Sequence, residues 1–153
     1  MSDNHKKIVS MRLSESDHMK IKRIAKRLGV RDSDIFRFAI KTTLAKLSPL
    51  DRYDRTGKEV ISAFIQSGKE LANFFSFDAD TLEAIINNGS TPEENHIELR
   101  DIELIAMSAL PDHYLQSKIN ELVDAEIANT GIDNALREYL YKKYLCQNET
   151  AEV

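Results

Sequence analysis

The chain has 153 residues, of which 42% are hydrophobic and 30% are charged, a composition typical of a globular protein rather than a disordered one. Apolar runs fall far short of the roughly 18 residues that a membrane span needs, and the opening MSDNHKK lacks the hydrophobic stretch of a secretory signal. We therefore expect no membrane association and a cytoplasmic location. The single cysteine, Cys146, cannot form an intrachain disulfide.

The net charge of -4 hides a division between two parts of the chain. Residues 1–47 carry 12 Lys/Arg and 5 Asp/Glu, a net of +7, whereas residues 48–153 carry 9 and 20, a net of -11. Such asymmetry is typical of a nucleic-acid-facing segment joined to an acidic one, although two solvated surfaces would look the same. Pro49 disfavours helical geometry at Ser48, so the sequence predicts a domain boundary there.

The first predicted element is a short strand over residues 8–13, IVSMRL. A single strand is not stable in water, because its backbone groups have no partner. We expect it to pair antiparallel with the same strand of a second chain. The alternation then separates a core-facing row, Val9, Met11 and Leu13, from an outward row, Ile8, Ser10 and Arg12.

Two helices are predicted next. Ser14 and Asp17 form a variant of the capping box, which predicts a helix start, and Gly29 supplies a left-handed stop. A second helix over 32–47 carries an apolar band too broad for one small neighbour. About 40 residues cannot bury this much apolar surface alone, so a second copy is expected to complete the core.

Residues 48–153 are predicted to form an acidic all-helical domain of about five helices, which serves oligomerisation or partner binding. The expected helices cover 56–75, 78–89, 97–110, a segment from about Leu115 that ends at Gly131, and a last one around 136–144. Their core candidates include Phe64, Phe74, Phe75, Phe77, Leu99, Ile102, Ile105, Ala106 and Leu110.

No catalytic signature is evident in this second part. Its two histidines, His96 and His113, lack the i, i+4 spacing that places two metal ligands on one helix face. The sequence therefore predicts neither an enzyme nor a cofactor or metal site.

The stretch VSMRLSESDHMKIKRIAKRLGVRDSDIFRFAI resembles the ribbon-helix-helix DNA-binding family of the Arc, MetJ and CopG repressors. The resemblance covers about residues 6–47. The resemblance rests on the order of the elements: an alternating strand, the LSES helix start, a basic first helix, the LGV turn and an apolar second helix. For these residues it implies one short strand and two helices in an intertwined, obligate homodimer. Together with the separate helical domain predicted for residues 48–153, this gives a mainly α fold.

The resemblance also implies which residues bind double-stranded DNA. Base contacts fall on Ile8, Ser10 and Arg12, and phosphate contacts fall on Val30, Arg31, Asp32 and Ser33. Lys6 and Lys7, in the arm before the strand, are expected to add further phosphate contacts. The chemistry suits these roles, because arginine can bond both acceptors of guanine, serine can bond either base type, and isoleucine can touch a thymine methyl. Helix N-termini also offer free N–H groups to phosphates.

This chain departs from the family near the phosphate site. The family often has Ser or Thr two residues after the turn glycine, where this chain has Arg31. Asp32 and Asp34 also place negative charge there, either as ordinary helix caps or as a feature that changes the phosphate site.

We therefore expect a sequence-specific DNA-binding protein, a dimeric transcriptional repressor whose paired strands read the major groove. The alternative is an antitoxin, or a plasmid partition or relaxosome accessory protein, whose C-terminal domain binds a protein partner. Whether dimers pair into tetramers is left open.

Overall fold

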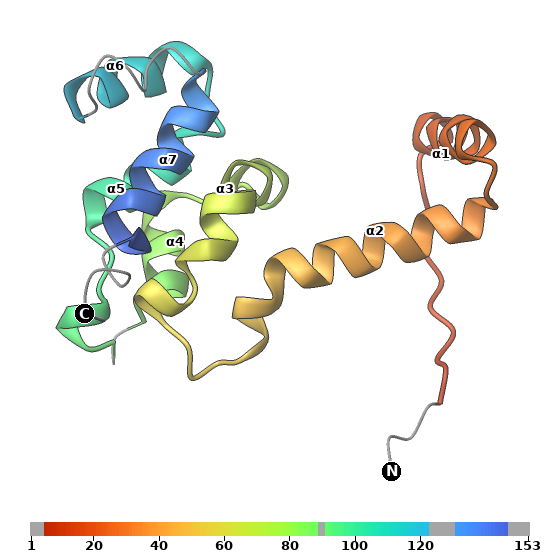
Figure 1. Ribbon diagram of the computed structural model, residues 1–153, viewed down its shortest axis with the longest axis horizontal. Helices are drawn as coiled ribbons and strands as arrows, with labels where there is room; N and C mark the ends of the chain where they lie inside the picture. The colour runs from red at the N-terminus through yellow and green to blue at the C-terminus, as the bar shows by residue number, and fades with distance from the viewer. Residues whose placement is uncertain (1–4, 89–90, 123–130, 147–153) are drawn as a thin grey trace. The chain divides into compact units, whose positions relative to one another are not determined.

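The computed structural model describes residues 5–88, 91–122 and 131–146 (Figure 1). The chain divides into two compact units, one up to Leu44 and one from Ala45 onward. The division falls inside the second helix, a few residues before the boundary predicted at Ser48.

The first unit contains α1, Glu15–Leu28, whose two ends are set by the residues that the sequence indicates. The hydroxyl of Ser14 accepts a hydrogen bond from the Asp17 backbone N–H at 3.1 Å and donates one to the Asp17 carboxylate at 2.8 Å. At the other end Gly29 has φ +68°, and the N–H groups of Gly29 and Val30 bond the carbonyls of Lys26 and Ala25. This closing pattern needs a left-handed residue, which glycine adopts without steric cost.

The second helix, α2, covers Asp32–Leu47, the range predicted from the sequence. Its first 13 residues belong to the first unit and its last three to the second. Leu47 packs against the core of the second unit.

The predicted strand over residues 8–13 is not observed. Residues 5–14 have no regular secondary structure, and no strand occurs anywhere in the described part of the chain. The physical reason is that a strand exists only where its N–H and C=O groups pair with another strand, and one chain supplies no second strand. The mainly α prediction is confirmed, whereas the ribbon is not seen in the single chain.

The second unit has five α-helices among its described residues, as predicted. Three short 3₁₀ helices lie between them or before them. The α-helices are α3, Ile61–Phe75; α4, Ala79–Ile86; α5, Leu99–Met107; α6, Asp112–Leu122; and α7, Ile132–Tyr144. The 3₁₀ helices are η1, Ser48–Asp51; η2, Gly57–Glu59; and η3, Glu93–Asn95. The predicted helix end at Gly89 lies outside the described residues, as do residues 123–130 of the helix predicted to end at Gly131. Gly131 itself directly precedes α7.

The first helix of this unit starts later than the sequence pattern indicates. Thr56 and Glu59 form a capping box that starts the 3₁₀ helix η2, so the α-helix α3 begins only at Ile61. Gly57 has φ +59°, and a Cβ there would lie 1.9 Å from the carbonyl oxygen of Asn95. Only glycine permits this close approach between η2 and η3.

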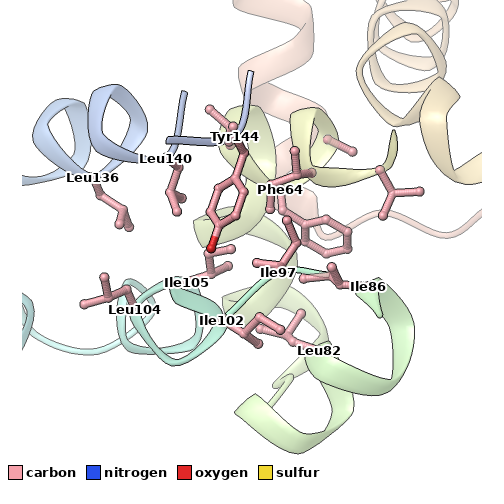
Figure 2. Close-up of a cluster of buried hydrophobic side chains, with 14 of the residues drawn as sticks. Phe64, Leu82, Ile86, Ile97, Ile102, Leu104, Ile105, Leu136, Leu140 and Tyr144 are labelled. Atoms are coloured by element: carbon pink, nitrogen blue, oxygen red, sulfur yellow. The ribbon is translucent and has the colours of Figure 1, made fainter. Parts of the chain in front are cut away.

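The core of the second unit lies where α3 packs against α5 and α7, with α4 against α5 and α6 against α5 and α7 (Figure 1). Figure 2 shows core side chains converging from α3, α4, α5 and α7 and from the segment before α5. The largest fully buried apolar side chains are Val60, Ile61, Leu82, Ile86, Ile97, Ile102, Ile105, Leu115, Ile119 and Leu140. The side chain of Asn87 bonds both backbone groups of Ile97 at 2.9 Å, which fixes the segment between α4 and α5.

No helix in the described residues is long and apolar enough to cross a membrane.

Candidate nucleic-acid interface

The residues predicted to contact bases lie in the irregular segment before α1. Ile8, Ser10 and Arg12 are exposed, and the neighbouring lysines Lys6 and Lys7 are exposed as well. The two predicted rows are not separated in the single chain, since Ile8 is 97% exposed and Val9 is 84% exposed. A core-facing row requires a core, which this segment lacks on its own.

The residues predicted to contact phosphates are brought together at the start of α2. Val30 follows the glycine turn, Arg31 precedes the helix, and Asp32 and Ser33 are its first two residues. Within the described part of the chain, the backbone N–H groups of Asp32 and Ser33 make no hydrogen bond. These are the orphan donors of a helix N-terminus, which can bind an anion.

Asp34 forms an ion-pair cluster with Arg31 and Arg37 beside these donors. Its carboxylate accepts the backbone N–H of Arg31 at 3.1 Å and the Arg31 Nε–H at 3.3 Å, and Arg37 approaches at 3.3 Å. The Arg31 side-chain and backbone hydrogen bonds lower the pKa of the Asp34 carboxyl below its ordinary value, against a smaller effect of burial. Asp34 therefore caps the helix, and two arginines offset its charge.

The sequence reading noted Asp34 as a cap but missed Arg37. The i, i+3 spacing of Arg31, Asp34 and Arg37 was the available signal, because such residues are neighbours on a helix surface. Arg31 and Arg37 balance the charges of Asp32 and Asp34 at this end of α2.

The first unit exposes most of its apolar side chains. Ala25, 1% exposed, is the one buried residue among its described residues, and α2 buries none. The exposed large apolar residues of this unit are Ile8, Val9, Met11, Leu13, Met19, Ile24, Leu28, Val30, Phe38, Ile40 and Leu44. So many exposed apolar side chains in one unit are typical of a surface that binds another molecule rather than of one that faces only solvent.

The first helix carries basic residues beside these apolar ones. Its exposed cations are Lys20, Lys22, Arg23, Lys26 and Arg27. One of them, Lys20, lies 3.8 Å from Asp17, an exposed contact that contributes little. Both apolar and cationic side chains of α1 are thus accessible to a partner.

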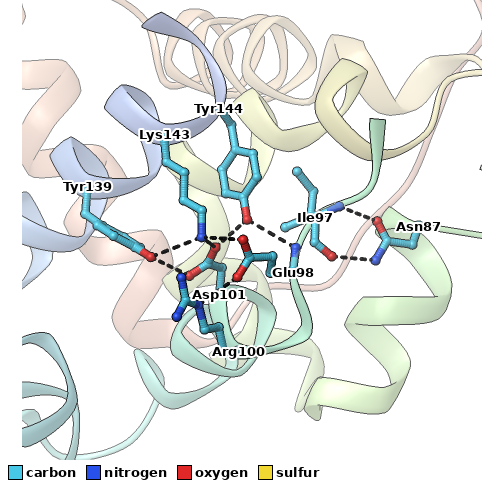
Figure 3. Close-up of polar contacts among 8 residues, drawn as sticks. All are labelled: Asn87, Ile97, Glu98, Arg100, Asp101, Tyr139, Lys143 and Tyr144. Carbon is cyan, nitrogen blue, oxygen red and sulfur yellow. Dashed lines mark hydrogen bonds and ion pairs between the residues drawn. The ribbon is translucent and has the colours of Figure 1, made fainter. Parts of the chain in front are cut away.

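A second cluster of polar residues lies inside the second unit, where α5 meets α7 (Figure 3). The carboxylate of Asp101 is fully buried, accepts the hydroxyls of Tyr139 and Tyr144, and contacts Lys143 Nζ at 2.7 Å. Lys143 also lies 3.0 Å from Glu98. Every oxygen of Asp101 is satisfied, so the cluster ties the two helices together rather than presenting a reactive group.

The pKa shifts in this cluster have distinct causes. Burial, then the hydrogen bond to Asp101, raises the pKa of the Tyr144 hydroxyl above its ordinary value, and the same causes act on Tyr139. Partial burial acts to lower the pKa of Lys143, but hydrogen bonds to Asp101 and Glu98 outweigh it and raise that pKa. Both tyrosines stay neutral donors and Lys143 stays charged at neutral pH.

Sequence reasoning missed this cluster. Tyr139, Lys143 and Tyr144 share one helix, but Asp101 lies 38 or more positions earlier, and nothing in the local pattern links them. Among the described residues, no group of three or more His, Cys, Asp or Glu side chains is placed to hold a metal ion.

Replacing Asp101 with asparagine is expected to destabilise the second unit by about 3 kcal/mol, because it leaves the partly buried Lys143 without its nearest anion. Urea unfolding of the variant measures this. Glu98→Gln is the matched control, since Glu98 contacts the same Lys143 from a half-exposed position, and it is expected to cost under about 1 kcal/mol. Equal losses in the two variants would contradict a structural role for the buried carboxylate.

Comparison of the chain with protein-family models, with curated proteins and with solved structures found no match. The resemblance of residues 6–47 to the ribbon-helix-helix family stays a prediction.

Proposed function

We propose that this chain is a sequence-specific DNA-binding protein, a transcriptional repressor that acts as a homodimer. Two copies of residues 8–13 pair as an antiparallel ribbon, and this ribbon enters the major groove of double-stranded DNA. A two-stranded ribbon has the width for that groove.

The observation that carries the proposal is that the first unit has almost no buried core of its own. It has well-capped helices but one buried residue, Ala25, and its apolar side chains are exposed from Ile8 through Leu44. A second copy would cover these side chains and would also supply the missing partner for the strand. Dimerisation would thus both pair the backbone groups of the strand and bury the exposed apolar side chains.

Charge and side-chain chemistry support DNA as the ligand. Residues 1–47 have a net charge of +7, which suits the phosphate backbone. In the paired ribbon, Ile8, Ser10 and Arg12 would face outward, where arginine can bond both acceptors of a guanine. The free N–H groups at the start of α2, beside Arg31 and Arg37, would bind the DNA phosphate backbone on either side of the major groove.

The salt dependence of DNA binding tests the proposal through Lys7. A lysine that contacts phosphate contributes about 1 to the slope of log K against log salt, and a dimer carries two copies. Lys7→Ala is therefore expected to reduce that slope by about 2 and to weaken binding about equally for all sequences. Fluorescence anisotropy of labelled duplexes at several salt concentrations measures both quantities.

The matched control is Lys118→Ala, which removes an exposed lysine from α6 in the second unit. It is expected to leave the slope unchanged. A chain that does not bind duplex DNA, or a slope that falls equally in both variants, would overturn the assignment of the first unit.

A further inference from the structure

The second unit has an open groove of about 450 Å³ where the end of α3, the start of α4 and the end of α5 meet. Small and apolar side chains form most of it, because alanines leave space between the larger residues. The apolar lining comprises Ala72, Phe77, Ala79, Ala106, Met107, Ala109 and Leu110. Asp78 is the one charged residue that lines it.

Apolar side chains that the sequence pattern assigns to a core are exposed at this groove and beside it. Leu110 is 51% exposed at its edge, and Phe75 is 56% exposed while its ring stacks on Phe77 at 5.3 Å between centroids. Phe75 also meets Phe74 edge to face at 5.0 Å, so the apolar surface continues beyond the groove. Extended apolar surface of this kind marks a contact site for another molecule.

The chain around the groove is almost free of cations. Between Lys69 and Lys118 the sequence has ten Asp/Glu and a single basic residue, Arg100, which is paired with Glu98 at 2.8 Å. Lys69 itself lies one helical turn before Ala72 and is paired with Asp133 at 2.9 Å. Asp80 follows the lining residue Ala79, and Glu103 lies one helical turn before Ala106 and Met107. Asp80 and Glu103 are exposed, so the groove combines a mostly apolar lining, in which Asp78 is the one charged residue, with acidic surroundings.

We propose that this groove binds a basic amphipathic helix of another protein. The inference goes beyond DNA binding, concerns the second unit alone and does not depend on the function proposed above. An amphipathic helix places apolar anchors at i, i+3 or i+4 and i+7 into such a groove. Its Lys and Arg side chains would then meet the acids at the rim, which favours this partner over neutral or acidic ones.

The same charges argue against other occupants. A second copy of the groove would bring acidic rims together, and like charges facing each other across an interface repel and disfavour the complex. Nucleic acid and anionic lipid are disfavoured for the same reason.

The test uses two libraries of displayed helices, selected against the full-length protein. Both libraries vary the apolar positions, and their remaining positions are Lys/Arg in one and Asp/Glu in the other. The basic library is expected to enrich binders, and the acidic library is expected to enrich none. Failure of the basic library to enrich binders above the acidic one would overturn the proposal.

Variants then locate the binding. Leu110→Ser and Phe75→Ser are expected to weaken the selected helices at least about 10-fold, and Asp80→Asn with Glu103→Gln about 5-fold. Tyr53→Ser removes a fully exposed aromatic residue outside the groove and is expected to change nothing. Thermal unfolding confirms that each variant is folded. Equal binding by Leu110→Ser and the parent chain would place the site elsewhere and overturn the assignment.

Sedimentation of the parent and Leu110→Ser proteins tests the competing occupant. The same oligomeric state in both supports an unrelated partner, whereas a smaller assembly in Leu110→Ser would show that a second copy covers the groove. Duplex-DNA binding by the same variants, expected to match the parent, reports separately on the function of the first unit.

Discussion

Replacing Ile40 with aspartate is expected to abolish dimerisation and, with it, specific DNA binding. In the single chain Ile40 is 54% exposed on α2, so a charge there meets water and costs the monomer little. In the proposed dimer the same side chain is buried twice. Burial of an isoleucine contributes about 1.5–3 kcal/mol, so the dimer loses roughly 3–6 kcal/mol before the cost of burying two carboxylates is added.

Analytical ultracentrifugation over a dilution series measures this effect. We expect the dimer dissociation constant to rise at least about 100-fold. Tyr53→Asp is the control, because Tyr53 is fully exposed in the second unit and lies outside the predicted dimer core. A dimer of unchanged affinity in Ile40→Asp would mean that α2 does not lie in the interface.

Replacing Arg12 with alanine is expected to remove most of the discrimination between a specific DNA site and random sequence. A bidentate contact from arginine to guanine contributes about 1–3 kcal/mol, and a dimer makes two of them. Specific affinity should therefore fall at least about 30-fold. Nonspecific affinity should fall far less, because it depends on the total positive charge.

Arg12→Lys separates the two contributions, since it keeps the charge and loses the planar fork that bonds both acceptors of guanine. It is expected to bind random DNA like the parent and to lose specificity like Arg12→Ala. Unchanged specificity in both variants would move Arg12 out of the groove and point to the opposite register of the ribbon. The opposite register differs by one residue in the pairing of the strands, which would turn Val9, Met11 and Leu13 outward and Ile8, Ser10 and Arg12 toward the core.

The helices were the most predictable part of the fold, because capping and turn residues act locally. Ser14 and Gly29 mark the ends of α1 in the sequence and in the structure, and Asp78 caps α4 as its position indicates. The error at the start of α3 has a non-local cause, since the contact of Gly57 with Asn95 joins residues nearly 40 positions apart.

Burial was less predictable, because periodicity reports an apolar face but not what covers it. The pattern assigned Phe74, Phe75, Leu99 and Leu110 to a core, and all four are exposed in the described chain. The same limit explains the missing strand: alternation in residues 8–13 indicates which side chains share a face, while pairing needs a second strand.

The candidate site likewise has a part that local sequence predicts and a part that depends on contacts with distant residues or a second chain. Val30 through Ser33 were predicted to share one place, and the glycine turn brings them together at the start of α2. The position of Arg12 relative to a core could not be predicted for one chain, because it depends on the partner. The buried Asp101 cluster left no local signal, since its members meet only after α5 and α7 pack.

Selection of bound duplexes from a random DNA pool by the full-length protein tests the central claim most directly. The proposal predicts enrichment of one palindromic or repeated site with a guanine at a fixed position in each half, because two Arg12 side chains would read symmetric positions. A pool that stays random after successive rounds would contradict sequence-specific binding and would favour a role based on protein partners.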